Sequence, residues 1–170
     1  MTQCSGLTRV EVVVLIFICG LFIGVSVPVY TMWTDRMHDA QCKHNLLAIG
    51  NALNAYGTDH QGVWPSLAAE RMTRSQQVPV LDVVLAPYAS SSNIFECPGD
   101  DNEVFQRTGS SYRWDFYPQA MKQQQGGIPD LSTATFRVES RPILLHQAIV
   151  LDKEPFHKSN SHANGLYLSR

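Results

Sequence analysis

The sequence predicts an α+β fold, in which one long N-terminal helix packs on a small antiparallel β-sheet. Three observations lead to this expectation: an uncharged apolar run from Val12 to Thr34, a helical stripe of apolar residues after it, and several short β-rich runs in the C-terminal half. The chain has 170 residues, which suits a single modest core beside the apolar arm. Its formal net charge of −2 gives no basic footprint, so nucleic-acid binding is not indicated.

The apolar run from Val12 to Thr34 predicts a membrane span. It contains no Asp, Glu, Lys or Arg, and about 20 apolar residues are enough for a helix to cross the hydrocarbon core of a bilayer. Glu11 lies directly before the run. An ionisable group inside a bilayer costs on the order of 3 kcal/mol, so this carboxylate either reaches the water interface or has a partner. The residue alone leaves both interpretations open.

A second apolar pattern predicts that the helix continues beyond the membrane. Its members recur at steps of four, three, four and three residues, which places them on one helical face: Cys42, Leu46, Ile49, Leu53 and Tyr56. Gly57 is the expected end of this helix. We therefore expect a single helix of about 50 residues, half in the membrane and half packed on a globular head.

The rest of the chain predicts a short helix followed by strands. Pro79 and Pro87 bracket the short helical run. Four runs are rich in β-forming residues and are separated by polar or Gly- and Pro-containing segments: NIFECPGDD (93–101), SSYRWDFY (110–117), RPILLHQAIVLD (141–152) and NGLYLS (164–169). These runs predict a small antiparallel sheet.

The N-terminal stretch SGLTRVEVVVLIFICG resembles the leader of type IV pilins and type II secretion pseudopilins. Gly6, Leu7 and Glu11 carry the resemblance by their spacing, and Pro28 and Tyr30 continue it along the apolar helix. The resemblance implies that a prepilin peptidase cuts between Gly6 and Leu7 on the cytoplasmic side and methylates the new amine. It also implies a single-pass protein of the bacterial inner membrane, with its N-terminus in the cytoplasm and its head in the periplasm.

The same resemblance implies assembly roles for Glu11 and Pro28. In the family the carboxylate pairs with the N-terminal amine of a neighbouring subunit, and a paired charge is far better tolerated in a membrane than an unpaired one. Arg9 is two positions from Glu11 and does not face it on a helix, so it is a poor substitute within one chain. Pro28 removes a backbone donor, which predicts a region that unwinds in filaments or, alternatively, a simple kink tolerated in lipid.

The head has a narrower resemblance, to the pilin-like proteins common in planctomycetes and their relatives. It rests on a Cys-and-Asn-Leu helix start at Cys42, a Cys-Pro-x-Asp loop at Cys97, a Ser-Ser-Tyr strand at Ser110 and a terminal His-Gly hairpin in HANGLYL. The expected division of the chain follows: a leader over residues 1–6, a transmembrane and assembly helix over 7–30, the head part of the helix over 31–57, and an α+β head over 58–170.

The cysteines predict one disulfide. Cys4 lies in the expected leader and Cys19 in the expected span, which leaves Cys42 and Cys97 as the pair in the head. A head outside the cytoplasm lies in a compartment that permits disulfides. We therefore expect a Cys42–Cys97 bridge, with two buried free thiols as the alternative.

The residue types that carry catalysis or metal binding form no recognisable pattern. Three histidines of the C-terminal quarter lack the spacing of a zinc-ligand pair: His146, His157 and His162. The segment GDDNE (99–103) lacks a regular alternation of calcium ligands and is expected to be a solvated turn. Ser110 and Ser111 lie in no nucleophile elbow. We expect no enzymatic activity, no cofactor and no metal site.

Two classes of function remain. The first is a structural subunit, a pilin or pseudopilin, that joins other subunits on an assembly platform to form a type II secretion pseudopilus or a type IV pilus-like filament. The second is a single-pass, membrane-anchored extracytoplasmic binding protein that keeps its N-terminus and never polymerises. The junction SGLTRVE favours the subunit, because an anchor needs neither the glycine cut nor the glutamate.

Overall fold

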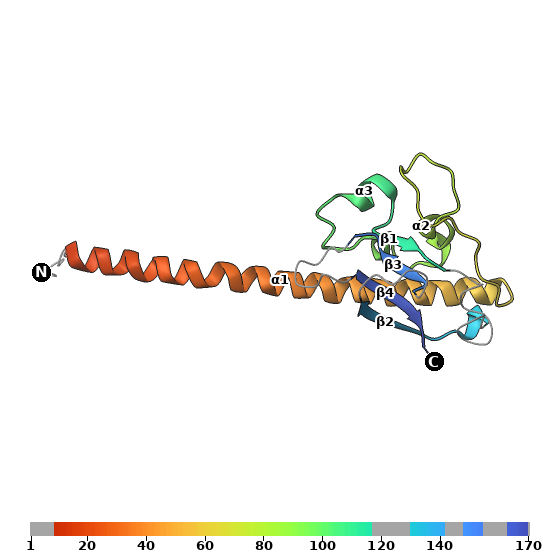
Figure 1. Cartoon of the computed structure of the whole chain (residues 1–170), viewed down its shortest axis with the longest axis horizontal. Coiled ribbons are helices and arrows are strands. Elements are labelled where there is room, and N and C mark those ends of the chain that lie inside the picture. The colour runs from red at the N-terminus through yellow and green to blue at the C-terminus, as the bar shows by residue number, and fades with distance from the viewer. Residues whose placement is uncertain (1–8, 117–129, 142–147, 155–162, 170) are drawn as a thin grey trace, which may run out of the picture.

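One long helix organises the whole molecule. The computed structural model describes residues 9–116, 130–141, 148–154 and 163–169. Helix α1 (Arg9–Asp59) is 51 residues long. Figure 1 shows its N-terminal half extending away from the head, while the remaining elements gather around its C-terminal half. The predicted α+β class, a long N-terminal helix packed on a small antiparallel sheet, is confirmed.

The two halves of α1 differ in what covers them. Every residue from 9 to 33 is exposed in the isolated chain. Farther along, the predicted stripe is buried in the core at Cys42, Leu46, Ile49 and Leu53, and Tyr56 packs against its margin. The helix thus has one end that the chain leaves uncovered and one end that serves as the main wall of the head.

The sheet has four antiparallel strands in the order β1-β3-β4-β2. Their bounds are β1 (Tyr112–Trp114), β2 (Phe136–Arg141), β3 (Val150–Asp152) and β4 (Ala163–Leu168). Strands β2 and β4 contact α1. Val150 and Leu166 are register partners, and both are fully buried in the core that the sheet shares with the helix.

Short helices follow α1 in the sequence and precede the first strand. These are α2 (Leu81–Val84), the 3-10 turns η1 (Ala86–Tyr88) and η2 (Ser92–Phe95), and α3 (Val104–Thr108); a further turn, η3 (Leu131–Thr133), precedes β2. The expected short helical run between Pro79 and Pro87 is confirmed by α2. Pro87 lies at the start of η1, where its missing N–H is tolerated.

Two details of the expected sheet are wrong. The run 93–101 forms no strand, because Ser91 accepts a hydrogen bond from the Asn93 N–H and caps the 3-10 turn η2. In its place the sheet contains β2, which was not among the expected strands and begins at Phe136. Within the expected run 141–152, residues 142–147 lie outside the described residues, and β3 forms from Val150 onward.

The expected end of the helix at Gly57 is also wrong, and the structure gives this glycine another role. Helix α1 ends at Asp59, and the chain turns through Gln61 and Gly62, which both have positive φ. A Cβ at Gly57 would lie 2.8 Å from both the Leu131 Cγ and the Ser132 backbone N. Gly57 is therefore required where η3 crosses closely over the helix.

Candidate functional site

The expected processing residues Gly6 and Leu7 lie outside the described residues. The described chain starts at Arg9, and Glu11 lies in the first turn of α1 with its side chain exposed. The carboxylate therefore marks the beginning of the uncovered apolar part of the helix. An acidic side chain in this turn is also favourable for the helix dipole.

The uncovered part of α1 carries large apolar side chains around its whole circumference. Ile16, Phe17, Phe22 and Ile23 are each at least 64% exposed. By length and composition, α1 is the one helix of the described chain that could cross a membrane. An apolar surface of this extent on a monomer marks a membrane or protein contact.

Helix α1 continues without a break through Pro28. Proline cannot donate to the carbonyl of Gly24, four residues earlier. Hydroxyl groups nearby bond to other carbonyls of this region: Ser26 Oγ donates to the Phe22 oxygen at 2.7 Å, and Thr31 Oγ1 donates to the Pro28 oxygen at 3.0 Å. The isolated chain is thus helical at Pro28, and unwinding of this region in a filament stays a prediction.

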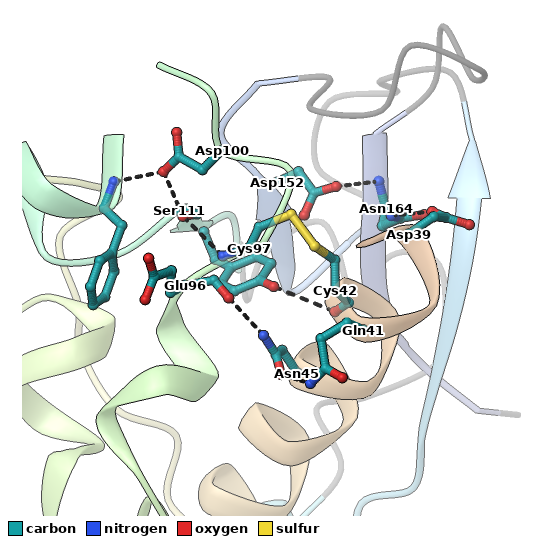
Figure 2. Close-up of a disulfide and its surroundings, with 12 residues drawn as sticks. Asp39, Gln41, Cys42, Asn45, Glu96, Cys97, Asp100, Ser111, Asp152 and Asn164 are labelled. Carbon is teal, nitrogen blue, oxygen red and sulfur yellow. Dashed lines mark hydrogen bonds between the residues drawn. A yellow bond between two sulfur atoms is a disulfide. The ribbon is translucent and has the colours of Figure 1, made fainter. Parts of the chain in front are cut away.

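The head part of α1 is joined to the loop after η2 by a disulfide between Cys42 and Cys97 (Figure 2). The two Cα atoms are 5.1 Å apart, well within the range that a disulfide requires. Both cysteines are buried, at 0% and 1% exposure. Of the other two cysteines, Cys4 lies outside the described residues, and Cys19 is a free, exposed thiol on the uncovered apolar part of α1.

Two hydrogen bonds support this disulfide from the helix side. Asn45, one turn after Cys42, donates from Nδ2 to the Glu96 carbonyl at 2.7 Å. The Tyr112 hydroxyl donates to the Cys42 carbonyl at 3.4 Å. Burial, and to a lesser extent the charge of Asp152, raises the pKa of the Tyr112 phenol, so it stays protonated and remains a donor.

On the loop side the disulfide is supported by Ser111 and Asp100. The Cys97 N–H donates to Ser111 Oγ at 3.1 Å, and that hydroxyl donates to Asp100 Oδ2 at 2.8 Å. Asp100 also accepts the backbone N–H groups of Val104 and Phe105, at 3.0 and 2.7 Å, and so caps the start of α3. Asp100, one of three acidic residues in the segment 99–103, is thus engaged with the fold of its own loop.

The structure brings together the segments on which the narrower resemblance rests. Cys42 of α1, the Cys-Pro-x-Asp loop and the Ser-Ser-Tyr strand converge at the disulfide, although Cys42 lies 55 residues before Cys97 in the sequence (Figure 2). The sequence singled out these segments but did not assign roles to Asn45, Ser111 and Asp100. The signal that could have identified them is the polar residue type at positions next to the two half-cystines.

The three candidate zinc ligands, His146, His157 and His162, lie outside the described residues. Within the described ranges, no three His, Cys, Asp or Glu side chains gather closely enough to hold a metal ion. The groups around the disulfide hold backbone segments together, because their hydrogen bonds run to carbonyls and amides of the chain itself.

Comparisons of the chain with known protein families, with curated proteins and with solved structures give no match.

Proposed function

We propose that this chain is a structural subunit, a pilin or pseudopilin, that polymerises through its N-terminal helix into a type II secretion pseudopilus or a type IV pilus-like filament after processing by a prepilin peptidase. The observation that carries the proposal is the division of α1 into an uncovered apolar half and a half that forms the wall of the head. In this arrangement the same rigid element inserts in the membrane, packs on other copies and displays the head.

The sequence at the start of α1 supports polymerisation over simple anchoring. A membrane anchor has no use for an acid at the first turn of its span, since such a group costs insertion energy. In a filament, Glu11 would bind the free amine of Leu7 in a neighbouring copy. Each charge lies in a poorly solvated place and is stabilised there by its partner. That pairing therefore favours copies set at one axial register.

The disulfide-bonded head supports an extracytoplasmic location. Disulfides persist in oxidising compartments and are rare in the cytoplasm. The proposed topology therefore places the N-terminus in the cytoplasm and the Cys42–Cys97 bridge outside it, with the inner membrane around the segment 12–34. The implied partners are the prepilin peptidase, other pilin or pseudopilin subunits and an assembly platform.

The experiment that tests this proposal is an intact-mass measurement on the full chain extracted from membranes that contain a prepilin peptidase. A processed subunit lacks residues 1–6 and carries one added methyl group on the Leu7 amine. A matched Gly6→Val variant should retain its leader, because the cut follows the glycine. If residues 1–6 remain attached in most of the wild-type membrane pool, the chain is an anchored binding protein and the proposal is wrong.

A further inference from the structure

Asp152 is a buried carboxyl group with too few hydrogen-bond donors. It ends strand β3, its residue is 2% exposed, and it lies in the surroundings of the disulfide (Figure 2). Its Oδ2 accepts the backbone N–H of Asn164 at 2.9 Å, whereas Oδ1 is buried and has no hydrogen-bond partner in the described part of the chain. A buried carboxylate normally requires several donors to offset the lost hydration.

Asp100, in the same region of the head, shows what a well-satisfied carboxylate looks like in this fold. Its two oxygens accept hydrogen bonds from the Val104 N–H, the Phe105 N–H and the Ser111 hydroxyl. Asp152 is more deeply buried, but among the described residues it accepts hydrogen bonds from Asn164 alone. The environment of Asp152 therefore fits a neutral carboxyl group better than an ionised one.

Asp152 also ends a polar connection between the sheet and helix α1. Asn164, on β4, donates from Nδ2 to Asp39 Oδ1 at 2.9 Å. Asp39 in turn accepts from Lys43 Nζ at 2.7 Å, one helical turn along α1. The order Lys43, Asp39, Asn164, Asp152 thus runs from the helix surface to the buried end of β3.

Among the described residues, the groups that face Asp152 from the packed elements do not balance a negative charge there. Helix α1 contributes Asp39 and Lys43, β4 contributes the amide of Asn164, and β1 contributes the protonated phenol of Tyr112. Burial is the largest effect and, together with the Asp39 carboxylate, raises the pKa of Asp152 to about 7; the Asn164 N–H and Lys43 oppose this shift only in part.

We propose that Asp152 is a pH-sensitive group at the junction of α1 with the sheet, to which Asn164 connects it, that it is protonated when the head is packed, and that its ionisation loosens the junction of α1 with β4. The proposal concerns the head alone and holds whether or not the chain polymerises. An ionised Asp152 would place a second negative charge near Asp39, and among the described residues Asn164 and Lys43 would offset it only in part.

The direction of the pH dependence follows from proton linkage. An aspartate in the unfolded chain ionises near pH 3.9, whereas the packed head holds this proton until about pH 7. The contribution of Asp152 to stability is therefore complete below about pH 4 and is lost as the pH rises through about 7. Between these limits, each pH unit multiplies the unfolding constant by up to about ten.

The test uses the full chain, with its disulfide intact, in detergent micelles. Urea unfolding at pH 5 to 8 is followed by tryptophan fluorescence for the wild type, for Asp152→Asn and for the exposed control Asp101→Asn. The asparagine at 152 keeps an acceptor for the Asn164 N–H but cannot ionise. We expect the rise in the wild-type unfolding constant between pH 5 and 7 to be absent from Asp152→Asn and kept in Asp101→Asn. Equal slopes in all three proteins would overturn the proposal.

A second measurement decides the matter even if Asp152→Asn does not fold. The side-chain carboxyl carbon of Asp152 is followed by NMR in the wild-type chain over the same pH range and below it. An inflection near pH 7 supports the proposal, and an inflection below pH 5 overturns it.

Discussion

Removal of the Cys42–Cys97 disulfide should cost a large part of the stability of the head. The bridge closes a loop with a sequence separation of 55 residues, for which the chain-entropy model gives about 4 kcal/mol of stabilisation at 25 °C. A domain of ordinary stability has only about 5 to 15 kcal/mol in total. For a head of this size, the loss corresponds to a fall of about 15 °C in Tm. The perturbation is the double variant Cys42→Ala/Cys97→Ala.

The assay is thermal and urea unfolding of the full chain in micelles, followed by far-UV circular dichroism and tryptophan fluorescence. The matched control is Cys19→Ala, because Cys19 is free, exposed and remote from the head core. We expect the control to unfold like the wild type. A double variant within about 1 kcal/mol of the wild type would refute the reasoning, since it would mean that the bridge does not constrain the unfolded chain.

Two further substitutions test close contacts of the head, one where η3 crosses α1 and one beside the bridge. Gly57→Ala should destabilise the head by about 1 to 3 kcal/mol, because the new methyl group meets the backbone of η3; Gly20→Ala, whose methyl group meets nothing within 4 Å, should leave urea unfolding of the head unchanged. Ser111→Ala should cost about 1 to 3 kcal/mol, because it leaves the buried Cys97 N–H without an acceptor. A Ser111→Ala head as stable as the wild type would show that this hydrogen bond has no net value.

The long helix was predictable because its signals are strong and local. The uncharged run 12–34 and the four-three spacing that starts at Cys42 each repeat over several turns, and both lead to one continuous element. The fold class followed from this helix together with the β-rich C-terminal half. The disulfide was predictable by position, since few cysteines were available to pair in the head.

The errors concern places where tertiary contacts decide the local structure. Ile94 and Phe95 look like strand residues, but a Ser91 cap and the nearby bridge hold them in a 3-10 turn. Strand β2 does alternate, but only Phe136 and Val138 on its core face are apolar, so the alternation is too short to stand out in the sequence. Gly57 resembles a residue that ends a helix. A glycine is needed there because η3 approaches the helix closely, which no local pattern reveals.

The candidate site was predictable only in part for the same reason. The spacing of Gly6, Leu7 and Glu11 is a sequence property, and the proposed role of the helix rests on it. The hydrogen bonds of Asn45 and Ser111 depend on segments more than fifty and about fourteen residues away. The partly satisfied carboxyl of Asp152 could not be inferred from the sequence, because it arises from the pairing of β3 with β4, whose Asn164 in turn contacts α1.

The most direct test of the proposed assembly is photo-crosslinking between copies in the membrane. A photoreactive amino acid replaces Phe22, which is 70% exposed on the apolar half of α1, in cells that supply the peptidase and an assembly platform. Polymerisation through α1 predicts a ladder of crosslinked oligomers for the otherwise wild-type chain. It predicts a much weaker ladder for Glu11→Ala, although this variant inserts normally because its span is more apolar; Asp101→Ala, an exposed acid of the head, should behave as wild type. A chain that yields only monomers, or a Glu11→Ala variant with an unchanged ladder, would contradict the account.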